Sequence, residues 1–254
     1  MIRYFILDLD GCLTIPFRSP DWPAVTRIRE LQLQSRDTEH IPSLTLCTGR
    51  PLPYAEAVAQ WLGIRDTIIF ESGGGFYHPE TNKLTWSPHY TEEIAKQSGE
   101  LRKWFEREVF PRFPEVMHEY TKHTDIGMVH NDYGQIRKIY EIAREKVEAE
   151  YPALEVHHTE ISVNVIVRAC NKESGLRFFA DEYGVSSGEI AYIGDSSGDL
   201  KALAWAGAAF APSNAIPEVR RVAAVMSGEA TRGVLEAYEQ LIARNQKPDG
   251  KDQG

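Results

Sequence analysis

The 254-residue sequence has few cysteines, no long apolar run and no excess of basic residues. Its three cysteines, Cys12, Cys47 and Cys170, form neither a CxxC pair nor an even disulfide framework, so we expect a reducing compartment, the cytoplasm. No apolar run approaches the roughly 20 residues that span a bilayer, which excludes a membrane partner. The formal net charge of −9 argues against a nucleic-acid partner, which a basic surface would bind.

Short apolar runs alternate with amphipathic stretches through most of the chain. The stretches between the runs place apolar residues at helical spacing, and glycine or proline stands near several of their ends. Strands that alternate with helices predict an α/β protein built on a doubly wound parallel sheet. Runs typical of buried strands occupy residues 4–8, 43–47, 67–70 and 190–193.

The middle third of the chain departs from this pattern. A predicted hairpin follows three consecutive glycines, and two long amphipathic helices are then mixed with strand-like runs, as in an α+β module. The sequence therefore predicts a core of residues 1–75 and 168–245, an inserted cap of residues 76–167, and a tail of residues 246–254. The tail contains no apolar residue, so we expect it to fray.

Acidic residues directly follow two of the predicted core strands. Asp8 and Asp10 close the first strand, and Asp195 and Asp199 flank a turn of small residues after a later one. Ligands of open α/β sheets bind at the carboxyl ends of strands. Acids directly after a buried run are costly without partners, which favours a binding site over solvated loop acids. For one of the later two acids, a helix N-cap is an alternative.

Two further segments carry groups that suit a phosphate. Thr48 and Gly49 close the second strand and offer a hydroxyl and backbone N–H groups. Lys172 opens a predicted helix, where it could neutralise phosphate or hold a carboxylate. Taken alone, each segment is also compatible with an ordinary strand end or a surface lysine. Their weight comes from the order in which all four segments occur.

The four segments in this order resemble the haloacid dehalogenase superfamily of aspartyl phosphohydrolases. The pattern DxDGxxT at residues 8–14 is followed by Thr48, by Lys172 and by GDxxxD at residues 194–199. The long insertion is similar to the type IIB cap of the Cof-type branch. The segments around the second and third strands resemble most closely the archaeal-type phosphoglycolate phosphatase and sugar phosphatase group.

This resemblance implies a Mg²⁺-dependent phosphatase, a phosphoric monoester hydrolase, that acts through an aspartyl phosphate. It implies Asp8 as the nucleophile and Asp10 as the general acid and base. The metal would be held by Asp8, Asp195 and the backbone carbonyl of Asp10, with Asp199 binding a metal-bound water or anchoring the lysine. The phosphoryl group would be held by Thr48, Lys172 and the N–H groups of Gly11 and Gly49. The expected partner is a small phosphate ester of the phosphoglycolate, sugar phosphate or glycosyl-phosphoglycerate type.

One position departs from the pattern of the superfamily. Many members carry asparagine where this chain has Gly198, so a hydrogen bond near the metal is missing or is replaced by Ser196 or Ser197. This substitution bears on the affinity for metal and leaves the implied chemistry unchanged.

Substrate choice is expected to rest partly on the cap, which closes over the site in this superfamily. His158 and Glu160 are cap candidates, although alternation on a half-solvated sheet explains them equally well. Arg50, beside the phosphate segment, and Asn214, in a loop of small residues, are further candidates, with a helix N-cap as the alternative for Asn214. The adjacent His157 and His158 do not predict a second metal, because neighbours on a strand point to opposite faces.

Two other functions are compatible with the same segments. A phosphomutase would use the same core and cap but would protect its aspartyl phosphate from water. A binding module without catalysis is disfavoured by the presence of all the acids and the lysine that the reaction needs. The sequence does not indicate an oligomeric state.

Overall fold

The apolar runs form a central sheet of five parallel strands in the computed structural model, which describes residues 1–247. In sheet order the strands are β12 (Ala224–Val225), β11 (Ala208–Ala211), β10 (Ile190–Ile193), β1 (Tyr4–Leu7) and β2 (Ser43–Leu46). Because side chains alternate along a strand, β1, β10 and β11 contribute apolar residues to both faces of this sheet.

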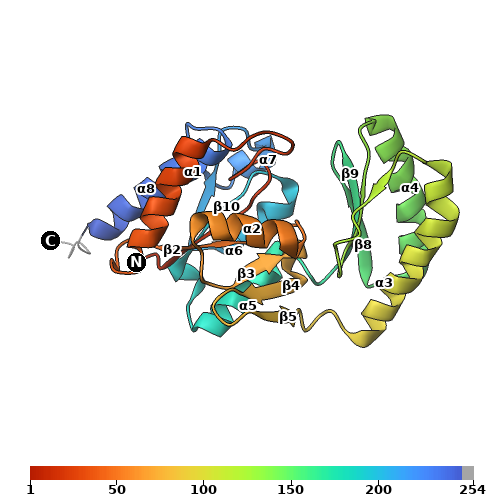
Figure 1. Ribbon diagram of the computed structural model, residues 1–254, viewed down its shortest axis with the longest axis horizontal. Coiled ribbons are helices and arrows are strands. Elements are labelled where there is room, and N and C mark those ends of the chain that lie inside the picture. The colour runs from red at the N-terminus through yellow and green to blue at the C-terminus, as the bar shows by residue number, and fades with distance from the viewer. Residues whose placement is uncertain (248–254) are drawn as a thin grey trace.

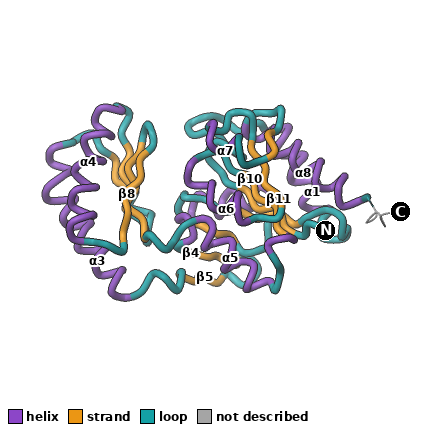
Figure 2. The backbone as a smooth tube through the Cα atoms, turned by 180° about the vertical axis from the view of Figure 1, so that it is seen from behind, coloured by secondary structure: helices purple, strands orange, loops and turns teal. Residues whose placement is uncertain are grey.

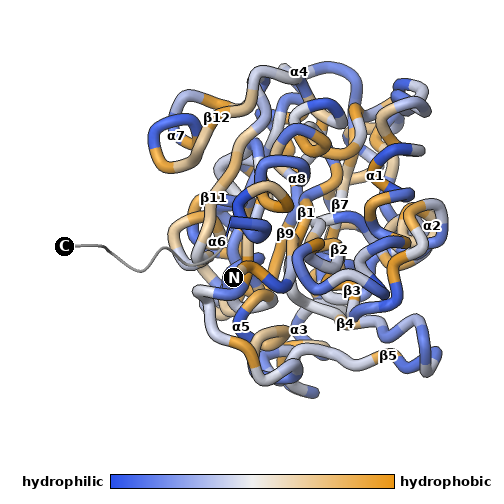
Figure 3. Tube along the Cα trace, turned by 90° about the vertical axis from the view of Figure 1, so that its left-hand side faces the viewer, coloured by the Kyte–Doolittle hydropathy of each residue, from blue (hydrophilic) through white to orange (hydrophobic). Residues whose placement is uncertain are grey.

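Helices cover both faces of the sheet (Figures 1 and 2). One face packs against α1 (Trp22–Gln34), α2 (Leu52–Leu62) and α8 (Ala230–Gln246). The other packs against α5 (Lys172–Tyr183), α6 (Leu200–Trp205) and the short α7 (Pro217–Arg220). Figure 3 shows apolar segments gathered among the strands and hydrophilic segments toward the outside. The predicted doubly wound α/β fold is confirmed.

A second, antiparallel sheet extends the core. It consists of β3 (Ile68–Phe70), β4 (Gly75–His78) and β5 (Lys83–Trp86), and a bridge between Cys47 and Ile69 joins it to the end of β2. Phe76 of β4 stacks on Phe178 of α5 with ring centroids 3.8 Å apart. The hairpin that the sequence assigned to the cap from residue 76 onward therefore packs with the core, and we propose that the cap begins after β5.

The cap has a sheet and an apolar cluster of its own. Its antiparallel strands are β6 (Met117–His118), β7 (Ile126–Val129), β9 (Ser162–Val167) and β8 (Leu154–His158). Helices α3 (Glu92–Trp104) and α4 (Tyr133–Glu150) cover the face that is turned away from the core (Figure 1). Residues such as Leu101, Ile139 and Val165 fill the space between the helices and the sheet. The other face of the cap sheet carries no helix and is oriented toward the core (Figure 1).

The C-terminal helix fastens the end of the described chain to its beginning. The Asn245 side chain accepts from the N–H of Ile2 (3.0 Å) and donates to its carbonyl (2.7 Å). Helix α8 continues through Gln246, so the first residue of the predicted tail is helical, and residues 248–254 lie outside the described part. No helix within residues 1–247 combines the length and the apolar character that a membrane crossing needs.

Candidate active site

The carboxyl ends of neighbouring strands bring the acidic segments together. Strand β1 lies between β10 and β2, so the residue that follows it, Asp8, is flanked by the loops of both neighbours. The N–H of Asp8 donates to the carbonyl of Ile193 at the end of β10 (3.1 Å), and the N–H of Cys47 donates to the carbonyl of Leu7 (2.8 Å). This pairing places the segments of Asp8, Asp195 and Thr48 at one edge of the sheet.

A buried lysine connects the acids of two of these segments. Lys172 is the first residue of α5, whose start is fixed by Asn171, the N-cap that accepts from the N–H of Ser174. The Nζ of Lys172 lies 2.8 Å from Asp8 Oδ1 and 2.6 Å from Asp199 Oδ1. Burial alone would lower the pKa of Lys172, but Asp199 and Asp8 raise it well above its ordinary value, so this amine is charged.

Asp199 is the acid that holds this lysine in place. Its Oδ1 also accepts from the hydroxyl of Tyr192 (2.6 Å), and its Oδ2 accepts from the N–H (2.9 Å) and hydroxyl (2.8 Å) of Ser196. Burial opposes ionisation, but the charge of Lys172 lowers the pKa of Asp199 below its ordinary value. Ser196 is one of the residues expected to compensate for Gly198, and it bonds to Asp199 here.

The charge of Lys172 does not compensate the buried acids Asp8 and Asp195 in full. Burial raises the pKa of Asp8 well above its ordinary value; Lys172 opposes the rise, and the charges of Asp199 and Asp195 add to it. Burial, followed by the charge of Asp199, raises the pKa of Asp195 to about 7. The Oδ1 atom of Asp195 is buried without a hydrogen-bond partner among the described residues. Two carboxylates thus contact the ammonium group of Lys172, and the charge of a third, Asp195, acts on the same site.

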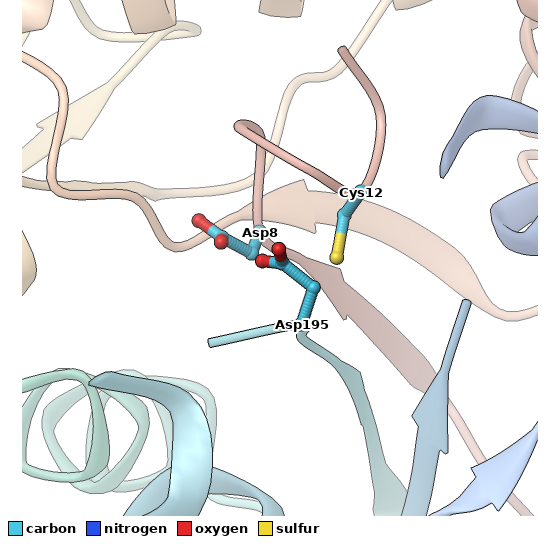
Figure 4. A group of neighbouring side chains, drawn as sticks. All are labelled: Asp8, Cys12 and Asp195. Carbon is cyan, nitrogen blue, oxygen red and sulfur yellow. The ribbon is translucent and has the colours of Figure 1, made fainter. Parts of the chain in front are cut away.

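A divalent cation fits this arrangement. Asp8, Asp195 and Cys12 offer ligand atoms that all lie within 4.8 Å of one another (Figure 4). Burial and then the charge of Asp8 raise the pKa of the Cys12 thiol well above its ordinary value, so it remains a neutral, soft donor. Carboxylate oxygens are the ligands that Mg²⁺ prefers, and the partnerless oxygen of Asp195 provides one. The donor set therefore suits Mg²⁺ through its two aspartates.

The predicted phosphate-binding groups differ in availability. The buried Thr48 hydroxyl accepts from the N–H of Arg50 (3.1 Å), and within the described part of the chain no acceptor takes its own hydrogen. Among residues 1–247 no protein acceptor takes the N–H of Gly49. The N–H of Gly11, in contrast, donates to the carbonyl of Thr14 (2.7 Å) inside a turn that requires the positive φ of 80° at Gly11. In this conformation the Gly11 N–H is therefore already used by the protein, and its role in phosphate binding stays a prediction.

Asp10 and Arg50 form an ion pair at the same edge. The guanidinium donates through Nε to Oδ2 (2.5 Å) and through Nη2 to Oδ1 (3.1 Å), and it lies over the ring of Tyr54 at 5.0 Å. Both groups are about one-third exposed, with 28% and 33% of their side chains accessible. The Asp10 carboxylate is thus turned to Arg50 and not to the pair of aspartates that could hold a metal.

The remaining substrate candidates lie elsewhere or are occupied. His158 packs 4.4 Å from the ring of Tyr140 on α4, because its register opposite Val163 turns it to the helical face of the cap sheet. This orientation does not support a substrate contact, which stays a prediction. Glu160 lies exposed in the turn between β8 and β9, where it forms no hydrogen bond or ion pair with the described residues. Its role stays a prediction.

Asn214 joins two backbone segments of the core. Its side chain donates to the carbonyl of Gly11 (2.8 Å) and accepts from the N–H of Ala230 at the start of α8 (2.8 Å). Both polar ends are therefore used by the protein here, and the substrate contact of Asn214 stays a prediction. The helix N-cap alternative is closer to the finding, although Asn214 accepts from the first residue of α8 and not from α7, the helix that directly follows it.

Three polar residues of this region escaped the sequence analysis. The sequence predicts Tyr192 as part of an apolar strand, and no motif indicates that its hydroxyl forms a hydrogen bond in the site. Lys122 lies in the cap between β6 and β7, and a lysine without a motif around it is usually a surface residue. Glu71 directly follows the buried strand β3, so the rule that selected Asp8 would have selected it as well.

Comparisons with known proteins agree on one family. A family model for haloacid dehalogenase-like hydrolases matches residues 103–237, which are 135 of the 254 residues. A curated phosphoglycolate phosphatase of Methanococcoides burtonii is 25% identical over 248 residues, covering 96% of this chain and 98% of the relative.

Solved structures share the fold over nearly the whole chain. The structure of Thermoplasma acidophilum 0175 has a TM-score of 0.74 at 19% identity and covers 95% of this chain and 98% of that one. The sucrose-phosphatase from Synechocystis, solved with sucrose and phosphate, has a TM-score of 0.70 at 16% identity and the same coverages, 95% and 98%. At these identities the likeness shows the fold.

The fold and the matched model define the class of the protein as a hydrolase with a doubly wound core and an inserted cap. The chain belongs to the haloacid dehalogenase-like hydrolase family. The resemblance inferred from the order of the four segments is therefore confirmed.

Proposed function

We propose that this hydrolase is a Mg²⁺-dependent phosphatase of small phosphate esters with Asp8 as its nucleophile. The observation that carries the proposal is the buried contact between Asp8 and Lys172 beside Asp195, whose Oδ1 has no protein partner. A phosphate dianion among these carboxylates requires positive charge from both the lysine and a cation. The matched hydrolase family and the curated relative named phosphoglycolate phosphatase support the same activity.

The residues of the site divide the proposed reaction into two displacements. An Asp8 carboxylate oxygen attacks phosphorus as the bond to the leaving oxygen breaks, and Asp10 gives that oxygen a proton. Water then attacks phosphorus and gives a proton to Asp10, while the bond to Asp8 breaks and inorganic phosphate leaves. The Nζ of Lys172 and the hydroxyl of Thr48 donate to the phosphoryl oxygens.

Mg²⁺ would be held by Asp8, Asp195 and the backbone carbonyl of Asp10, where it supplies positive charge opposite the phosphate. The protein itself controls the proton. Because Asp10 is paired with Arg50 in the structure, it has to leave the guanidinium before it can reach the leaving oxygen. We therefore propose that the substrate takes over Arg50 and so releases Asp10.

The substrate is proposed from the relatives. Phosphoglycolate is the first candidate because the curated relatives carry that name. Sugar phosphates are the second, because the sucrose-phosphatase shares the fold across both core and cap. Both are small esters in which the group that leaves with the bridging oxygen would lie between the core edge and the cap sheet.

A phosphate-release screen tests the proposal. The purified chain is given p-nitrophenyl phosphate, phosphoglycolate, 3-phosphoglycerate and several sugar phosphates, with Mg²⁺ or with EDTA. We expect release that requires Mg²⁺, with phosphoglycolate among the best substrates. Release that is equally fast in EDTA would remove the metal from the proposal, and no release from any ester would overturn it.

A further inference from the structure

A buried glutamate in the turn after β3 bonds the core to the cap. Glu71 is 2% exposed, and its carboxylate accepts from the N–H groups of His123 (2.8 Å) and Thr124 (2.5 Å) and from the Thr124 hydroxyl (2.7 Å). A longer bond comes from the N–H of Asp125 (3.4 Å). These donors lie in the cap loop of residues 119–125, between β6 and β7. This loop is not one of the two chain crossings between core and cap, so the glutamate adds a third, non-covalent attachment.

The same turn is bonded to the segment that carries the phosphate-binding hydroxyl. The N–H of Glu71 donates to the carbonyl of Arg50 (3.1 Å), and the N–H of Ser72 donates to the carbonyl of Thr48 (2.8 Å). Gly73 lies so close to the start of α5 that an added Cβ would stand 2.6 Å from the carbonyl of Asn171, the neighbour of Lys172. One turn therefore contacts the Thr48 segment, the lysine helix and the cap loop.

The backbone of this turn is held in a conformation that its residues rarely adopt. Glu71 and Ser72 have φ angles of 46° and 56°, in the left-handed region that favours glycine. Such residues persist only where the surrounding bonds over-determine them, and they gather at functional sites. Here the bonds to the Thr48 segment on one side and to the cap loop on the other supply that constraint.

The cap loop is held from its opposite side by an arginine of the cap. Arg102 of α3 donates to the carbonyls of Lys122 (2.9 Å), His123 (2.8 Å) and Asp125 (2.6 Å). The peptide groups of the loop thus direct their N–H ends to a core carboxylate and their carbonyl ends to a cap guanidinium. Charge at both ends strengthens each bond, so the loop has a defined position relative to both parts.

We propose that Glu71 is a positioning residue for the phosphatase reaction proposed above, on which this inference rests. Its carboxylate holds loop 119–125 and its backbone holds the Thr48–Arg50 segment, so the cap and the phosphate-binding hydroxyl share one anchor. Glu71 itself touches no reacting atom. Without its charge the cap loop is released, the strained turn relaxes, and the Thr48 hydroxyl loses its fixed direction toward a bound phosphate.

The test is the variant Glu71→Gln with two readouts that need no turnover. Glutamine keeps the size of the side chain but turns N–H groups toward the donors of the loop. We expect amide hydrogen exchange at residues 123–125 to become about tenfold faster or more, and the Kd of inorganic phosphate in the presence of Mg²⁺ to rise about tenfold, as for the loss of hydrogen bonds to a charged group. The KM of p-nitrophenyl phosphate should rise in parallel.

A matched variant and a milder one keep the result interpretable. Glu182→Gln removes another core carboxylate, which bonds to Thr67 and His78 and not to the cap, so exchange at residues 123–125 and the phosphate Kd should stay at wild-type values. Thr124→Val removes only one bond from the cap side and should move both readouts in the same direction, about two- to threefold. It serves where Glu71→Gln does not fold.

The outcomes separate this inference from the proposed function. Faster exchange with an unchanged phosphate Kd would make Glu71 a structural fastening and overturn the inference. Unchanged exchange in both variants would overturn it as well. A wild-type chain that binds phosphate but releases none from any ester would instead refute the phosphatase, and the phosphate Kd of the variants would still decide the role of Glu71 in positioning the anion.

Discussion

Two lysines of this protein are buried between carboxylates, one in the core and one in the cap. Lys172 contacts Asp8 and Asp199, whereas Lys122 contacts Glu119 at 3.2 Å and Asp125 at 3.1 Å. The chemical groups are the same, and both amines have a raised pKa because their acid neighbours outweigh burial. The two clusters differ in whether each polar side-chain atom has a hydrogen-bond partner.

The cap cluster is complete, and the core cluster is not. The third hydrogen of Lys122 has an acceptor in Asn164 Oδ1 at 2.8 Å, so each hydrogen of this amine has an acceptor in the protein. In the core, Asp195 keeps a buried oxygen without a partner among the described residues. Burial raises the pKa of Asp125 to about 6 and that of Asp195 to about 7, so a raised pKa does not distinguish the clusters. Between these two clusters, the carboxylate oxygen without a partner distinguishes the one that we propose to bind a ligand.

Neutralising one acid in each cluster should give the largest contrast. Asp8→Asn removes the proposed nucleophile, so phosphate release should fall at least about 10⁴-fold while the fold is kept. Asp125→Asn changes an acid of the complete cluster and should keep the rate within about tenfold, with a lower midpoint of thermal unfolding. Steady-state phosphate release and circular dichroism measure both. Equal losses of phosphate release in the two variants would contradict the distinction between the clusters.

Replacing each lysine by methionine should give the next contrast. Lys172→Met removes a donor to the phosphoryl group and leaves two buried carboxylates unpaired, so we expect a rate loss of about 10²–10³-fold together with reduced stability. Lys122→Met should cost about 3–5 kcal/mol of stability and leave the folded protein active. Urea unfolding and assays well below the unfolding midpoint separate the two effects. An inactive but stable Lys122→Met protein would place that lysine in the reaction.

Metal binding should depend on the incomplete cluster alone. We expect Mg²⁺ to raise the thermal unfolding midpoint of the wild type and of Asp125→Asn, because an ion that binds the native state stabilises it by mass action. Asp195→Asn should lose most of this shift. Differential scanning fluorimetry over a series of Mg²⁺ concentrations measures it, and a full shift in Asp195→Asn would move the metal to other ligands.

The pH dependence of metal binding should be a smaller effect of the same origin. Asp195 has a raised pKa of about 7 and must be ionised to hold the cation. Below that pH each bound ion displaces at least the proton of Asp195, so the apparent Kd of Mg²⁺ should rise about tenfold or more for each unit of decreasing pH. Calorimetric titrations between about pH 5.5 and pH 8.5 follow this change. A Kd that is constant over that range contradicts the assignment of Asp195.

The contrast between the clusters also shows what the sequence could predict. Asp8 and Asp195 were found because each follows a buried strand, and that is a local pattern. The partners of Lys122 depend on a strand pairing that brings Asn164 beside it from 42 residues away. No local pattern encodes that contact.

Strand register and distant contacts explain why His158 and Asn214 have protein partners that the sequence did not indicate. His158 faces α4 because β8 pairs with β9 in one register, and a shift of one residue would have turned it to the core. Asn214 is used by Gly11, which lies 203 residues earlier in the chain. The fold was predictable because apolar periodicity is repeated in every strand and helix, whereas each of these side-chain roles depends on a single long-range contact.

The most direct test of the phosphatase is to trap the phosphoryl group on the protein. The chain is mixed with Mg²⁺ and p-nitrophenyl phosphate, quenched with acid within a turnover, digested, and analysed by mass spectrometry. We predict a phosphorylated peptide whose modified residue is Asp8, and no such peptide from Asp8→Asn. A phosphoryl group found on another residue while the wild type releases phosphate would contradict the account.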